Sequence, residues 1–313
     1  MKKLVSLLLA LVMMLSVMSF ATAEEEPFVL TVMLPDFYAT VDYMAEDNPV
    51  IKAIEEATGA RLEITWAANS TYGDQLNTTL TDEVLPNLMV MTDARGTTMV
   101  NNARAGAFHD LTDFVADTAN YPNLAGDPTI YNNISIDGRI YGIYRTRAYP
   151  RAGIYYRTDI AKEMGFDKEV KTLDDLTELA EALAKYSDDT YALNMCSYTA
   201  GTINVITVAF GAPNNWGIDE NGQIYPAHQS PAYLEGLNWL RHLYEIGGID
   251  PNFATIDSTQ WDNIERTNKA FMRFDCMDNG YRQQEWFEKN AGTTEQIFEI
   301  CGPIAKADGT ITL

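Results

Sequence analysis

Residues 28–35 have the sequence FVLTVMLP, a short apolar run that is rich in residues favoured in strands and stops at a proline. A run of this length that is bounded by Pro35 is typical of a buried strand rather than of a helix. Residues 48–59, NPVIKAIEEATG, follow it. Asn48 is a good N-cap, Pro49 suits the first helical position and Gly59 suits the end of a helix. We therefore predict a strand and then a helix at the start of the folded chain.

The same alternation continues outward from this stretch. Residues 61–66 alternate polar with apolar side chains, which is the period of a strand. We predict helices over 72–84 and 97–105 and a strand over 87–91. The resulting βαβαβα order predicts a parallel sheet with crossover helices.

A second α/β unit is predicted beyond Tyr144, because Pro150 and three arginines interrupt the periodic pattern between Tyr144 and Arg151. Thr172 and Asp175 have the spacing of a capping box at the start of one of its helices. An Asp137-Gly138 turn signal precedes it. A strand is predicted over 139–144, before this unit. Beyond the boundary the predicted strands are 152–156, 272–276 and 297–303, and the predicted helices are 158–164, 172–186, 231–246, 261–271 and 282–290.

The first residues have the features of a secretory signal peptide. Lys2 and Lys3 precede an apolar run over 4–18, and residues 21–23, ATA, provide the small side chains that a signal peptidase accepts. A retained membrane anchor is the alternative, but the run is short and is followed by three glutamates. We expect cleavage after Ala23 and an extracytoplasmic protein, without a cysteine at that position to carry a lipid.

The composition excludes several classes of protein. The 22 Lys and Arg residues stand against 44 Asp and Glu residues, a formal charge of −22, which argues against a nucleic-acid or anionic-membrane binder and favours neutral ligands over anionic ones. The 3 cysteines do not form a disulfide framework, and the sequence does not decide whether Cys276 and Cys301 form a single disulfide. A hydrophobic content of 46% suits an ordinary globular protein of about two domains.

No motif of a known catalytic or cofactor site is present. The 3 histidines are scattered, and there is no HExxH, GxSxG or GxGxxG sequence. We therefore expect no catalytic residue, no metal and no cofactor. Carboxylates are numerous enough that a secreted glycoside hydrolase, which needs two of them at a suitable separation, remains an alternative.

Aromatic residues give the positive functional signal. Several stand where strands end or loops begin, beside short polar residues, as in 66–69, WAAN, and 214–216, NNW. Sugar rings pack on flat aromatic faces, and their hydroxyl groups need partners such as Asp, Asn and Arg. The alternative for each aromatic residue is an ordinary place in the core. The pattern favours a carbohydrate ligand.

A series of short motifs resembles the family 1 extracellular solute-binding proteins, the carbohydrate-type binding subunits of bacterial ABC importers. Each motif is weak alone, but their order and spacing agree over residues 28–313. The matching segments are Asn48–Ile51, Glu55–Gly59, Leu85–Leu88, Asp137–Ile143, Tyr156–Asp159, Lys171–Leu176, Phe210–Ala212 and Leu243–Pro251.

The resemblance implies an α/β, type II periplasmic-binding-protein-like fold, in which each of two lobes is a mainly parallel sheet flanked by helices and the ligand lies in the cleft between them. It implies an N-terminal lobe over 24–144, a C-terminal lobe over 145–296 and a segment, 297–313, that crosses back towards the N-terminal lobe. Members usually continue well past this segment, so we expect the chain to stop before its N-terminal lobe is finished.

The implied function is capture of a sugar or oligosaccharide by a monomer that delivers it to the transmembrane permease subunits of an ABC importer. The alternatives are the glycoside hydrolase and a truncated paralogue that does not bind. From their positions after predicted strands and near the crossing between lobes, we expect these ligand-binding residues: Asp36, Phe37, Trp66, Asn69, Tyr72 and Asp93 in the N-terminal lobe, and Arg145, Trp216, Trp261 and Asp278 beyond it.

Overall fold

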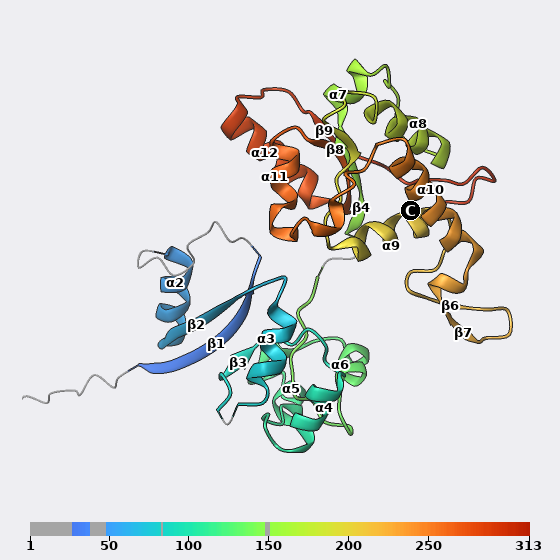
Figure 1. Cartoon of the computed structure of the whole chain (residues 1–313). Coiled ribbons are helices and arrows are strands. Elements are labelled where there is room, and N and C mark those ends of the chain that lie inside the picture. The colour runs from blue at the N-terminus through green and yellow to red at the C-terminus, as the bar shows by residue number, and fades with distance from the viewer. Residues whose placement is uncertain (1–26, 38–47, 83, 148–150) are drawn as a thin grey trace, which may run out of the picture. The chain divides into compact units, whose positions relative to one another are not determined.

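The structure is a computed structural model that describes residues 27–37, 48–82, 84–147 and 151–313. The predicted signal peptide lies outside the described residues. The chain divides into two compact units, Met1–Tyr144 and Arg145–Leu313, and each is considered by itself (Figure 1).

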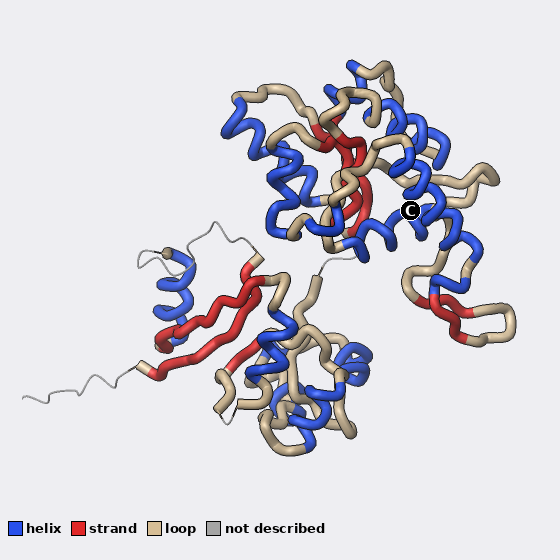
Figure 2. The backbone as a smooth tube through the Cα atoms, viewed as in Figure 1, coloured by secondary structure: helices blue, strands red, loops and turns tan. Residues whose placement is uncertain are grey.

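The first unit contains a parallel sheet, as the βαβαβα order predicted. Figure 2 draws its strands in red. Its strands are β1 (Phe28–Asp36), β2 (Ala60–Ala68) and β3 (Leu88–Met89), in the order β2-β1-β3. β1 pairs with β2 along its whole length, from Phe28 opposite Ala60 to Asp36 opposite Ala68. The helices are α2 (Pro49–Thr58), α3 (Tyr72–Thr79), α4 (Thr97–Arg104), α5 (Thr112–Ala116) and α6 (Pro128–Ile134), with a 3₁₀ turn, η1 (Pro122–Leu124).

Local signals explain where α2 begins and ends. The Asn48 side chain accepts a hydrogen bond from the amide of Val50 at 3.0 Å, as an N-cap should. Gly59 ends the helix in the left-handed region at φ +68°. The apolar face of α2 is nevertheless uncovered, because the helix buries none of its residues and Val50 is 63% exposed.

Two predictions for this unit were wrong. The helix expected over 72–84 ends at Thr79, and the strand expected over 139–144 does not form. Only a single bridge joins Ile136 to Arg139, because Asp137 and Gly138 both have positive φ and close a tight turn. The chain beyond this turn pairs with no strand of the sheet among the described residues.

The second unit is built on a mixed sheet in the order β5-β8-β4-β9. β5 runs parallel to β8, whereas β4 runs antiparallel to both β8 and β9, so the expectation of a mainly parallel sheet needs correction here. A separate hairpin pairs β6 with β7. The strands are β4 (Ala152–Arg157), β5 (Tyr191–Leu193), β6 (Trp216–Ile218), β7 (Ile224–Pro226), β8 (Ala270–Cys276) and β9 (Phe298–Ile300).

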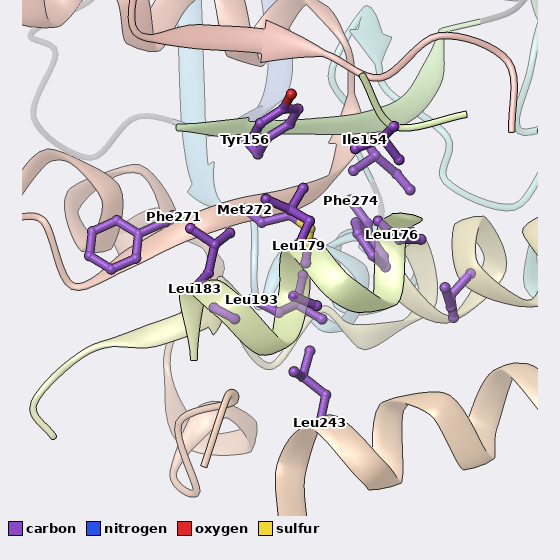
Figure 3. Close-up of a cluster of buried hydrophobic side chains, with 14 of the residues drawn as sticks. Ile154, Tyr156, Leu176, Leu179, Leu183, Leu193, Leu243, Phe271, Met272 and Phe274 are labelled. Atoms are coloured by element: carbon purple, nitrogen blue, oxygen red, sulfur yellow. The ribbon is translucent and has the colours of Figure 1, made fainter. Parts of the chain in front are cut away.

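A large apolar core joins this sheet to its helices (Figure 3). Leu176, Leu179 and Leu183 of α8 are fully buried against strands β4, β5 and β8. The capping box predicted at the start of α8 is confirmed, since Thr172 and Asp175 cap each other's backbone amides. The helices are α7 (Thr158–Glu163), α8 (Leu173–Leu183), α9 (Thr199–Ala209), α10 (Pro231–Glu245), α11 (Trp261–Arg266) and α12 (Asp278–Ala291), with 3₁₀ turns η2 (Ala227–Gln229), η3 (Phe253–Thr255) and η4 (Ser258–Gln260).

Residues 297–313 pack on this same unit, where the sequence had suggested a crossing towards the N-terminal lobe. β9 pairs with β4 at the edge of the sheet. The amide of Ala305 then donates to the carbonyl of Lys171 at 2.8 Å, and the amide of Ile304 donates to the carbonyl of Leu313 at 2.9 Å.

The three cysteines are free thiols. Cys276 ends β8 and Cys301 follows β9, and these strands flank β4 on opposite sides. The Cys276–Cys301 disulfide, which the sequence analysis kept as an alternative, is therefore not formed.

Candidate ligand-binding surfaces

The carboxyl ends of the strands in the first unit bring polar side chains and one aromatic ring to a single edge of the sheet. Asp36 ends β1 and the exposed Phe37 follows it. Asn69 follows β2, and its amide donates to the carbonyl of Asp36 at 3.0 Å. Asp93 lies on the exposed loop after β3, where its carboxylate accepts the amide of Arg95 at 3.1 Å. Ligands of parallel α/β sheets bind at this edge, so these four residues form a candidate surface, the N-edge.

Tyr72 and Trp66 occupy different surroundings from the N-edge. Tyr72 is 1% exposed, and its hydroxyl donates to the carbonyl of Val90 at 2.8 Å. Burial raises the pKa of Tyr72, and the hydrogen bond with Val90 partly opposes this. The ring therefore supports the sheet from within. Trp66 is half-buried inside β2, opposite Leu34 of β1.

The second unit presents a comparable edge where β5 and β8 end and β4 begins. Asp278 opens α12 directly after β8 and is exposed, with its carboxylate 3.3 Å from the guanidinium of Arg282. Tyr198 precedes α9 and is 53% exposed. We call Tyr198 and Asp278 the C-edge. Tyr198 was not predicted, because the strand before it is only three residues long and gives no clear periodicity.

Trp261 lies beneath the C-edge rather than on it. The residue is 4% exposed, and its indole nitrogen donates to the carbonyl of Asn194 at 3.1 Å. Its ring meets the ring of Tyr198 edge to face, with centroids 6.2 Å apart. Arg273 belongs to the buried strand β8, and its guanidinium carbon lies 3.7 Å from the centroid of the Trp261 ring. Trp261 therefore supports the exposed Tyr198 from below.

A buried charged cluster surrounds Arg273. The guanidinium group lies 2.7 Å from a carboxylate oxygen of Asp262, 2.8 Å from one of Asp275 and 3.7 Å from one of Glu265. Glu265 also accepts hydrogen bonds from the Tyr155 hydroxyl at 2.9 Å and from the Asn194 side chain at 2.7 Å. Burial raises the pKa of Glu265 to about 6, although the charge of Arg273 acts in the opposite direction.

This cluster makes a pH-dependent contribution to stability. The folded-state pKa of Glu265 lies above its ordinary value of 4.5, so protonation favours the folded state. The contribution is fully present below about pH 4.5 and is lost as the pH rises through about 6, a change of about 2 kcal/mol in the free energy of unfolding. Urea unfolding at several pH values should show this loss, and Glu265→Gln should remove it.

Two other carboxyl groups have shifted pKa values, but they titrate below the pH range of this measurement. The pKa values of Asp110 and Asp175 are lowered to about 2, chiefly by hydrogen bonds from Thr112 and Lys168 respectively. Both carboxylates stay ionised between pH 4.5 and 6, so they do not affect the measurement there. An unchanged pH slope in Glu265→Gln would show that Glu265 is not the group responsible.

Arg145 and Trp216 are both exposed. Arg145 is exposed, and partial burial together with the charges of Arg147 and Arg151 lowers its pKa. Trp216 is 64% exposed on the β6–β7 hairpin.

Among the described residues, no group of three His, Cys, Asp or Glu side chains could hold a metal ion. In the same part of the chain, no helix combines the length and apolar character that a membrane span requires.

Comparison with known proteins places the chain in a family. Residues 50–273 match the family described as bacterial extracellular solute-binding protein. The chain is 31% identical over 279 residues to lipoprotein LipO of Bacillus subtilis (strain 168), covering 86% of this chain and 54% of the relative. It is 30% identical over 264 residues to the polygalacturonan/rhamnogalacturonan-binding protein YtcQ of the same strain, covering 82% and 52%. The chain thus spans about half the length of the curated relatives it matches.

The fold agrees with this match. A crystal structure of the alginate-binding protein AlgQ2 without calcium ion superposes with a TM-score of 0.70 at 18% identity, covering 92% of this chain and 60% of that chain. The predicted type II periplasmic-binding-protein-like fold is therefore confirmed. Since the family match covers most of the described chain, this protein belongs to the bacterial extracellular solute-binding proteins.

Proposed function

We propose that this protein captures a sugar or oligosaccharide outside the cytoplasmic membrane and delivers it to the permease subunits of an ABC importer. The observation that carries the proposal is the family match together with two sheet edges that offer sugar-binding groups. The printed name of the polygalacturonan/rhamnogalacturonan-binding relative supports a carbohydrate ligand.

The chemistry of the two edges suits a sugar. At the N-edge, Asp36, Asn69 and Asp93 can accept hydrogen bonds from hydroxyl groups, and the 41% exposed Phe37 can pack on the apolar face of a ring. The C-edge repeats the combination with Asp278 and Tyr198. Arg145 and Trp216 are further exposed candidates for hydroxyl contact and stacking. We infer binding without turnover, because the family consists of binding proteins.

The remaining features of the proposal follow from the sequence. We propose export by a signal peptide that is cleaved after Ala23, without a lipid at the new N-terminus, and action as a monomer. Mass spectrometry of the exported protein would give its N-terminal residue, and sedimentation would give its oligomeric state. A protein that retains residues 1–23 would contradict the cleavage.

A thermal-shift screen tests the proposed ligand class. A ligand that binds only the folded state adds about 2.7 kcal/mol to the free energy of unfolding at 100 times its Kd. We expect at least one sugar or oligosaccharide to raise the Tm in proportion to the logarithm of its concentration, and amino acids and peptides to leave it unchanged. Stabilisation by peptides alone would contradict the proposal.

Phe37→Ala tests the N-edge directly. Loss of an exposed stacking ring should weaken sugar binding by about tenfold and leave the Tm of the free protein unchanged. Phe114→Ala is the matched control, because Phe114 is similarly exposed, at 44%, but lies in α5 away from the strand ends. If Phe37→Ala bound the sugar as tightly as Phe114→Ala, Phe37 would not be part of the binding site.

A further inference from the structure

The exposed ring of Tyr198 lies against a glycine of helix α9. Gly201 belongs to the first turn of this helix. A Cβ atom on Gly201 would lie 3.1 Å from Cε1 of the Tyr198 ring and 3.7 Å from both Cζ and the hydroxyl oxygen. Carbon atoms in favourable contact are about 3.5–4.0 Å apart. The Tyr198 ring therefore occupies space that any side chain at position 201 would need.

The backbone next to Tyr198 is fixed on both sides. The amide of Ser197 donates to the carbonyl of Ile256 at 2.8 Å, and the amide of Thr199 donates to the carbonyl of Ser197 at 3.0 Å. The first of these bonds ties the segment before α9 to the segment that leads through η4 to Trp261. Tyr198 and Trp261 are thus carried by two segments that a backbone hydrogen bond joins.

Trp261 gives the Tyr198 ring its second contact and is itself held in place. The side-chain amide of Asn194 donates to the carbonyl of Trp261 at 3.0 Å, and the indole nitrogen of Trp261 donates to the carbonyl of Asn194 at 3.1 Å. Trp261 is only 4% exposed, so the packed interior leaves its ring little room to move. The Tyr198 ring is therefore held by the protein itself while 53% of the residue stays exposed.

We propose that Gly201 is a positioning residue of the sugar site, because the absence of a side chain there lets the Tyr198 ring lie against α9 as a fixed stacking platform. This inference rests on the proposed function and names a residue that sets the geometry of its site. A ring that is already held loses little conformational freedom when a sugar packs on it, which favours binding. Glycine is unfavourable within a helix, so the stability of α9 alone gives no reason for a glycine at this position.

Substitution of Gly201 separates binding from stability. Gly201→Ala should displace the ring slightly and weaken sugar binding about threefold, and the larger Gly201→Leu should weaken it about tenfold. Alanine and leucine both favour a helix more than glycine does, so the Tm of the free protein should stay the same or rise. A merely structural role would instead lower the Tm together with the affinity.

Calorimetry of the exported, full-length protein gives the affinities. The probes are three neutral trisaccharides, cellotriose, xylotriose and mannotriose, and one acidic trisaccharide, trigalacturonate. Gly73→Ala is the matched control, because Gly73 lies in the first turn of α3 and a Cβ atom there would meet nothing within 4 Å. This control should bind each sugar as the unchanged protein does. Equal affinities in Gly201→Leu and Gly73→Ala would overturn the role of Gly201.

A double-mutant cycle shows whether Gly201 acts through Tyr198. If it does, Gly201→Leu should change the sugar affinity of the Tyr198→Ala variant by less than about twofold. A loss of the same size with and without the Tyr198 ring would overturn the inference, since Gly201 would then affect binding by another route.

NMR follows the position of the ring without a sugar. The rings of Trp261 and Tyr198 meet edge to face with centroids 6.2 Å apart, so the signals of the Trp261 indole depend on where the Tyr198 ring lies. Comparison with Trp261→Phe assigns these signals. We expect Gly201→Leu to shift them and Gly73→Ala to leave them unchanged, and unshifted signals in Gly201→Leu would overturn the inference. Silence of every sugar in calorimetry would count against the proposed function instead, and the NMR result would still decide whether Gly201 positions the ring.

Discussion

Replacement of Arg273 by alanine is expected to lower the free energy of unfolding of the second unit by about 3–5 kcal/mol. The guanidinium group is 5% exposed, and its removal would leave the buried carboxylate of Glu265 without its nearest positive charge. Asp262 and Asp275 would lose an ion pair at 2.7 Å and 2.8 Å, and the Trp261 ring would lose the cation beside its face. Breaking a buried charge pair is costly because the remaining charge stays out of water.

Urea unfolding followed by tryptophan fluorescence measures this change, because four of the five tryptophans lie in the second unit. Arg241→Ala is the control, since its ion pair with Glu245 is exposed and should contribute less than about 1 kcal/mol. A loss in Arg273→Ala no larger than in this control would show that the buried cluster does not stabilise the fold. Trp261 and the Tyr198 loop would then need another support.

Leu179→Ala is expected to lower the free energy of unfolding by about 3–5 kcal/mol. Leu179 is 0% exposed in the middle of α8, and it packs in the same core as Phe271, Met272 and Phe274 of β8 (Figure 3). Truncation removes apolar contacts and leaves a cavity that the surrounding helix and sheet can fill only in part.

Leu234→Ala provides the matched control for the core substitution. Leu234 is a helical leucine of the same unit, on α10, but it is 61% exposed. Its replacement should change the free energy of unfolding by no more than about 0.5 kcal/mol. Similar losses in the two variants would mean that the core assigned to α8 is not the main apolar core of the unit.

The sequence predicted the elements that have strong local signals. The N-cap Asn48 and the left-handed Gly59 fixed α2, and the capping box fixed α8. α9 was missed because its apolar and β-branched side chains lie all around the helix, so that no period of 3.6 stands out. The reversed direction of β4 was also missed, since strand direction depends on partners far along the chain.

Candidate site residues were harder to predict than elements. Phe37 and Asp278 lie on exposed sheet edges, whereas Tyr72 and Trp261 stand in similar sequence positions and are buried. A large aromatic side chain suits a core and a sugar site equally well, and tertiary packing decides between them.

We propose that this protein binds a sugar and leaves it unchanged. The most direct measurement is a calorimetric titration of the exported protein with acidic and neutral oligosaccharides, followed by mass spectrometry of the recovered ligand. We predict saturable binding of one sugar per chain and recovery of that sugar intact. Heat released only with peptides or amino acids, or recovery of a shortened glycan, would contradict it.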